Sequence, residues 1–96
     1  MNQAGWRDFI KLCLKTDNEK VLSSLFDFIL TQEEKESIAL RYLIIKELLK
    51  QEKTQRDMAK DLQVSIAKIT RGSNELKRTS PKLVEFLKKN IYNLRT

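Results

Sequence analysis

The chain has 96 residues, of which 41% are hydrophobic, so we expect one folded domain and not a disordered chain. With only 2 Gly and 1 Pro, it offers few tight turns, which disfavours a β-sandwich or barrel. The longest apolar runs are far too short to span a bilayer, and the first residues lack the pattern of a signal peptide. The single cysteine, Cys13, fits a reducing compartment. We therefore expect a cytoplasmic protein without a membrane partner.

The residue types present argue against an enzyme. The chain has no histidine and one cysteine, which excludes Cys–His dyads, Ser-His-Asp triads and histidine-based metal sites. The adjacent carboxylates Glu33 and Glu34 fall in the expected first turn of a helix, where the helix dipole accounts for them. We expect no catalytic residue, no metal and no cofactor.

Capping signals and apolar spacing predict helices along the whole chain. Thr31 and Glu34 have the spacing of a capping box, Thr54 and Ser65 can cap two further helices, and Ser80 stands before Pro81 at a favoured first helical position. The apolar positions between these caps recur at helical spacing. The expected fold class is all-α, with helices at about residues 5–16, 19–30, 32–51, 55–62, 66–78 and 81–93.

The positive charge is concentrated in the C-terminal half. Residues 1–52 hold 8 Lys/Arg and 9 Asp/Glu, a net charge of −1, whereas residues 53–96 hold 11 and 4, a net charge of +7. A basic half indicates either a surface that meets nucleic acid or an ordinary solvated basic surface.

The third helix is apolar nearly all round. Its apolar side chains cover most of the circumference; they are Ile38, Leu40, Tyr42, Leu43, Ile44, Ile45, Leu48 and Leu49. Six short helices hardly surround such a helix, so we predict an obligate dimer with a shared core. The alternative is a monomer that leaves some of these side chains on its surface.

Arg41 interrupts that apolar arc. A buried guanidinium needs a paired anion or several acceptors. Arg41 therefore predicts one of two arrangements. Either it forms a structural salt bridge or extends its charged end to a nearby edge, or it belongs to a ligand site.

Residues 55–69 have the arrangement of a helix-turn-helix. Met58, Ala59 and Leu62 form the apolar side of a short first helix, and Ala59 is small where the two helices must pass closely. Val64 packs in the turn. Gln63 stands where such turns often carry Gly, so its backbone must tolerate a left-handed conformation.

The second helix of this pair divides into three faces. Ile69, Gly72 and Leu76 face the core. An outer face with short side chains near the N-terminus suits close approach to base edges; it comprises Ile66, Ala67, Thr70, Asn74 and Lys77. Together with the basic half, this face predicts binding to double-stranded DNA.

The third face is a stripe of Lys68, Arg71 and Glu75, with Gly72 beside it. Such a stripe can hold a zwitterion, with its carboxylate on the cations and its ammonium near Glu75. The alternative is an intrahelical pair of Arg71 with Glu75 at i, i+4 spacing.

These segments resemble the Trp repressor family. The resemblance is most specific in the hexapeptide Ile69-Thr70-Arg71-Gly72-Ser73-Asn74, preceded by Gln55-Arg56 and Leu62. It extends to Phe28-Ile29-Leu30-Thr31, followed by Arg41 and Glu47-Leu48-Leu49, and covers the chain from about Trp6 onward. It implies an intertwined homodimer of six-helix, single-domain subunits (residues 1–96). Residues 1–52 and 81–96 would form the dimer core, and residues 55–78 the DNA-reading unit.

The resemblance also implies a corepressor. Such repressors bind L-tryptophan and then an operator, and so repress genes of tryptophan biosynthesis or salvage. By position, Arg41 and Arg71 would sandwich the indole, and Arg71 would pair with the carboxylate. The carbonyls of Phe28 and Leu30, from the other subunit, would receive the ammonium, and Thr31 and Gly72 would line the pocket.

This sequence departs from the family at a few positions. Lys68 stands where the pocket usually has Thr, and Glu75 where it usually has Ser. On the DNA side, Gln55 and Arg56 match reading positions of the first helix, whereas Ala59 replaces a common Lys contact.

Two other functions remain open. One is a ligand-independent helix-turn-helix module of the replication-initiator kind, and the other is a small helical interaction protein. The first would bind DNA without needing tryptophan, unlike a tryptophan-dependent repressor. The second would show no salt-dependent affinity for DNA.

Overall fold

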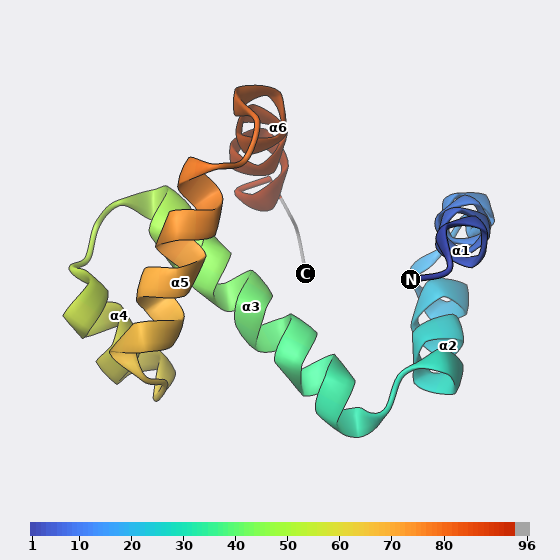
Figure 1. Ribbon diagram of the computed structural model, residues 1–96, viewed down its shortest axis with the longest axis horizontal. Helices are drawn as coiled ribbons and strands as arrows, with labels where there is room; N and C mark the ends of the chain where they lie inside the picture. Colours follow the sequence, from blue (N-terminus) through green and yellow to red (C-terminus); the bar gives the residue numbers. More distant parts are fainter. Residues whose placement is uncertain (94–96) are drawn as a thin grey trace. The chain divides into compact units, whose positions relative to one another are not determined.

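A computed structural model describes residues 1–93, which fold into six helices without a strand (Figure 1). The helices are α1 (Gln3–Lys15), α2 (Glu19–Ile29), α3 (Gln32–Lys50), α4 (Gln55–Leu62), α5 (Ile66–Lys77) and α6 (Pro81–Ile91). Every boundary lies within two residues of its predicted position, and the all-α prediction is confirmed. Residues 94–96, which close the expected core segment 81–96, lie outside the described residues.

The predicted caps account for where the helices begin. The backbone N–H of Thr31 donates to Glu34 Oε1 at 2.8 Å, and the N–H of Glu34 donates to Thr31 Oγ1 at 3.1 Å. Ser65 and Ser80 accept from the third residue after each of them, at 3.3 Å. Each cap satisfies a backbone donor that the helix itself leaves without a partner.

The chain separates into two compact units. The first, Met1–Ser37, contains α1, α2 and the start of α3. Its rings form a short series in which Phe9 lies 5.8 Å from Trp6 and 6.2 Å from Phe26 between ring centroids. No residue of this unit is buried.

The second unit begins at Ile38 and contains the rest of α3 with α4, α5 and α6. Its core is a cluster from three helices, with Ile44 and Leu48 of α3 packed with Met58, Ala59 and Ile69. Leu40, Leu62, Val64 and Leu76 cover the edges of this cluster. The helix-turn-helix is therefore built onto the C-terminal part of α3 and shares its core.

The turns on either side of α4 use left-handed backbone. Gln63 has φ 56° and ψ 46°, as its position in the turn predicts, and Gln51 before α4 has φ 57°. The chain reverses at Gln63, where the N–H of Val64 donates to the carbonyl of Ala59 at 3.0 Å. A left-handed residue at this point lets the following residues satisfy carbonyls at the end of the helix.

We expect Gln63→Gly to stabilise the protein by about 0.5–1 kcal/mol, because a left-handed conformation costs a side-chain-bearing residue energy that glycine does not lose. Urea unfolding measures the change. The control is Lys60→Gly inside α4, which should destabilise by about 1 kcal/mol. A loss of stability in Gln63→Gly would contradict the expectation.

The C-terminal end of α6 is tied to α3. The Tyr92 hydroxyl donates to the carbonyl of Lys46 at 3.2 Å. Burial of the phenol, followed by the negative charges of Glu47 and Glu52, raises the pKa of Tyr92 above its ordinary value. The folded state therefore favours the neutral phenol.

The stabilisation by Tyr92 should therefore be complete below pH 10 and should be lost as the pH rises through the raised pKa of the folded state. Tyr92→Phe should cost about 1 kcal/mol at neutral pH and should remove this alkaline loss. Urea unfolding between pH 7 and 11 measures both effects. An equal alkaline loss in wild type and Tyr92→Phe would contradict the assignment.

Candidate nucleic-acid interface and ligand site

The helix-turn-helix is formed by α4 and α5, which pack against each other. Ala59 is buried in the shared cluster, as its small size at the helix crossing predicts. The sequence therefore places a small residue where α4 packs into the core that it shares with α3 and α5.

The predicted core face of α5 is less exposed than its other two faces. On the core face, Ile69 is fully buried, and Gly72 and Leu76 are half-buried. The residues predicted for the outer face are all exposed: Ile66, Ala67, Thr70, Asn74 and Lys77. The stripe residues Lys68, Arg71 and Glu75 are exposed as well. One helix therefore presents two different polar surfaces to solvent.

Two of the predicted DNA-contact residues are joined directly. Thr70 Oγ1 on α5 donates to Gln55 Oε1 at the start of α4, at 2.9 Å. Arg56, the next residue of α4, is exposed. The outer face of α5 thus continues onto the N-terminal turn of α4.

The charge pairing of the stripe differs from the alternative considered from the sequence. Glu75 pairs with Arg78, at i, i+3 spacing, and not with Arg71. Among the ion pairs of residues 1–93, none involves Lys68 or Arg71. Sequence reasoning did not consider Arg78, although its i, i+3 spacing from Glu75 also permits pairing.

Gly72 allows α5 to approach α3 closely. A Cβ at this position would lie 3.0 Å from Ile44 Cγ2 and 3.4 Å from Leu48 Cδ1. A side chain there would require Ile44 to shift by a few tenths of an ångström. The glycine therefore makes room for Ile44 and Leu48 of α3, the helix that carries Arg41.

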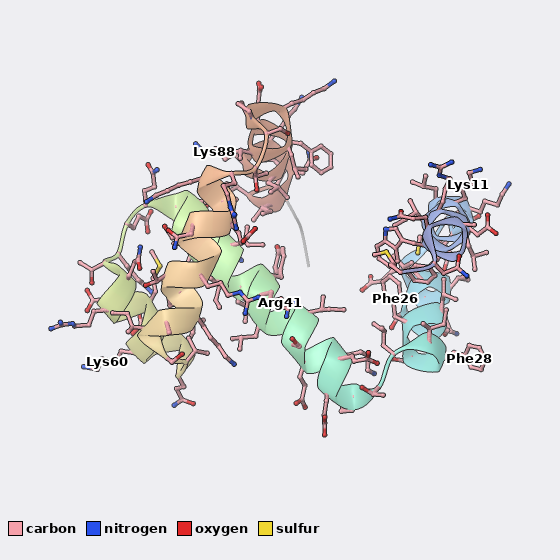
Figure 2. The ribbon with its side chains drawn as sticks, in the orientation of Figure 1. Lys11, Phe26, Phe28, Arg41, Lys60 and Lys88 are labelled. Atoms are coloured by element: carbon pink, nitrogen blue, oxygen red, sulfur yellow. The ribbon has the colours of Figure 1, made fainter. Side chains whose placement is uncertain are left out.

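Arg41 lies at the middle of α3 (Figure 2). Within the single chain it is exposed, as are Ile38, Tyr42 and Leu43 around it. It takes part in none of the ion pairs of residues 1–93, so the salt bridge considered from the sequence is absent there. Arg41 and the α5 stripe belong to the same compact unit.

The other predicted ligand residues belong to the first unit. Phe28 is 88% exposed and its ring projects away from α2 (Figure 2). Leu30 is the C-cap of α2, and Thr31 caps the start of α3. Carbonyls in the last turn of a helix lack intrahelical partners and carry the negative end of the dipole, so this turn suits a cation.

A second charged cluster, which the sequence did not predict, connects the end of α3 to α4. Lys53 Nζ lies 2.7 Å from Asp61 Oδ2 and 3.7 Å from Glu47 Oε2. The hydrogen bond with Asp61 raises the pKa of Lys53. This cluster connects the loop before α4 to both α3 and α4.

The α4–turn–α5 unit has an exposed outer face and lies in the basic C-terminal half of the chain. Together these features define a helix-turn-helix DNA-binding protein. The model of the family described as Trp repressor protein matches residues 4–91. The chain belongs to the Trp repressor family, whose members are DNA-binding transcriptional repressors and not enzymes.

Individual relatives match nearly end to end. The chain is 48% identical over 89 residues to a Trp operon repressor homolog of Chlamydia trachomatis serovar L2, covering 93% of this chain and 95% of that protein. A homolog of Chlamydia caviae is 48% identical over 87 residues, covering 91% and 86%. One of Mannheimia succiniciproducens is 37% identical over 89 residues, covering 93% and 88%. Among the described residues, no helix is long and apolar enough to cross a membrane.

Proposed function

We propose that this repressor is controlled by L-tryptophan: it binds tryptophan as corepressor and then its operator, and so represses tryptophan biosynthesis or salvage genes in the cytoplasm. The observation that carries the proposal is that α5 exposes a short-side-chain outer face and, separately, a stripe with two cations outside any ion pair of residues 1–93. A ligand on the stripe would therefore hold the helix that reads DNA.

The DNA contacts are assigned to the outer face of α5 and the start of α4. Small and β-branched side chains there permit close approach to base edges in the major groove, while cations contact phosphates. The proposed DNA-contact residues are Gln55, Arg56, Ile66, Ala67, Thr70, Asn74 and Lys77. All of them except the half-buried Gln55 are exposed, which supports this assignment.

The proposed tryptophan contacts come from α3 and α5 of one subunit and from the end of α2 of a second subunit. The guanidinium planes of Arg41 and Arg71 would stack on the indole, and Arg71 with Lys68 would face the carboxylate. The carbonyls of Phe28 and Leu30, from a second subunit, would receive the ammonium. Thr31, Gly72 and Glu75 would complete the pocket.

A homodimer is proposed because much apolar surface in a single chain is uncovered. Large hydrophobic side chains are exposed on every helix but α4; examples are Trp6, Val21, Ile38, Ile66 and Phe86. The first unit buries no residue at all, and a unit of this size without a core cannot offset its conformational entropy alone. A second copy of the chain would supply the missing contacts.

Unfolding should therefore depend on protein concentration. For an obligate dimer, each tenfold dilution should lower the unfolding midpoint, because the folded state is inseparable from association. Thermal unfolding at 1, 10 and 100 µM, together with sedimentation, measures this. A folded monomer at micromolar concentration would contradict the proposed assembly.

Tryptophan would act by fixing α5 relative to α3. It can raise DNA affinity only by binding the DNA-competent arrangement more tightly than the others. Arg41 is on α3 and Arg71 is on α5, so a ligand stacked between them would connect the two helices. Linkage then requires operator DNA to raise tryptophan affinity by the same factor.

We expect Arg71→Ala to abolish the effect of tryptophan on DNA binding, because it removes a stacking plane and the carboxylate's partner. Arg41→Ala removes only a stacking plane and should reduce the effect less. Calorimetry with L-tryptophan and gel shifts with and without it measure both steps. A wild-type chain that binds no tryptophan would remove the corepressor proposal.

Glu75→Ser provides the matched control on the same stripe. Because Glu75 is held by Arg78, it does not occupy Arg71, and we expect Glu75→Ser to change tryptophan affinity much less than Arg71→Ala does. A gain comparable in size to the Arg71→Ala loss would show that Glu75 competes for Arg71. A loss of that size would show that Glu75 holds the ammonium.

The second candidate is a ligand-independent DNA-binding module. The observation that favours it is the pair of departures at Lys68 and Glu75, which alter the charge of the proposed pocket. Equal operator affinity with and without tryptophan would support this candidate.

A further inference from the structure

We propose that Gln55 and Thr70 act together as one reading element, which recognises a single adenine in the major groove. This inference rests on the proposed operator binding and adds to it the identity of one base. It assigns that base to a pair of residues from two different helices.

The two side chains are already joined in the free protein. Thr70 Oγ1 lies 2.9 Å from Gln55 Oε1, so the first residue of α4 is bonded to the fifth residue of α5. Gln55 is half-buried, which restricts its side chain, and Thr70 is exposed directly after the fully buried Ile69. The pair is therefore held in place by the packing of both helices.

The bond between them determines which polar groups remain for a base. The Thr70 hydroxyl uses its one donor on Gln55, so its oxygen is left as an acceptor and the Gln55 NH₂ as a donor. Rotation of the Gln55 amide by half a turn exchanges these roles. The Gln55 NH₂ then donates to the Thr70 hydroxyl oxygen, which leaves the Thr70 hydroxyl as a donor and the Gln55 carbonyl as an acceptor. In both arrangements the pair offers one donor beside one acceptor.

Only one base matches that pattern on its major-groove edge. Adenine presents the N7 acceptor beside the N6 amino donor, whereas guanine presents two acceptors. Cytosine presents only a donor, and thymine an acceptor with a methyl group. The neighbouring outer-face residues Ile66 and Ala67 have apolar side chains and add no competing polar group.

The first test is selection from a duplex DNA library with randomised positions, using the full chain with L-tryptophan. Wild type should show one position at which adenine is preferred over guanine by about tenfold or more. Thr70→Val and Gln55→Met should both reduce that preference to less than about twofold, at the same position. Thr70→Ser should retain it, because the hydroxyl remains.

Thr79→Val is the matched control. It makes the same substitution two residues after the end of α5, where the Thr79 hydroxyl donates to the carbonyl of Glu75 and lies outside the outer face. It should leave the preference unchanged. Circular dichroism of each variant confirms that the helices are retained.

Base analogues give the second test. In the selected duplex, replacing the adenine by 7-deazaadenine removes the N7 acceptor, and replacing it by purine removes the amino donor. Each analogue should weaken wild-type binding severalfold. Neither should weaken Thr70→Val or Gln55→Met further, since these variants have already lost the contact.

Three outcomes would overturn the inference while leaving operator binding intact. They are a base other than adenine at the affected position, losses at different positions in the two variants, and an unchanged preference in either variant. A wild-type chain that enriches no sequence would overturn the proposed function together with the inference.

Discussion

The close packing of α5 on α3 is the contact on which the remaining features depend. Ile69 is fully buried in the cluster with Ile44 and Leu48. At Gly72 the two helices lie so close that an added Cβ would be 3.0 Å from Ile44 Cγ2. With one face of α5 held in this way, its other two faces are directed to solvent. The same contact thus sets how the outer face and the cationic stripe are placed relative to α3.

Most of the fold could be predicted from the sequence because its signals are local. Thr31, Ser65 and Ser80 mark helix starts through hydrogen bonds that span three residues, and these bonds are present. The core face of α5 followed from the spacing of Ile69, Gly72 and Leu76. The left-handed turn at Gln63 followed from its place between two predicted helices.

The sequence did not determine which of several nearby groups each polar side chain pairs with. Glu75 has cations three and four residues away, and spacing alone does not decide between Arg78 and Arg71. The bond from Thr70 to Gln55 and the contacts of Lys53 with Glu47 and Asp61 join different helices or a loop to a helix. Such contacts depend on how the helices pack, which periodicity does not specify. The exposure of Arg41 likewise depends on what a second chain would cover.

The two left-handed residues on either side of α4 bear on how stiff the reading unit is. Gln51 and Gln63 both adopt a conformation that glycine enters freely, yet neither is glycine. A glycine at either point would give the chain many more backbone conformations, whereas a glutamine confines it to few. The turns at both ends of α4 are therefore poor hinges. The helix-turn-helix is then expected to resist bending both between α3 and α4 and between α4 and α5.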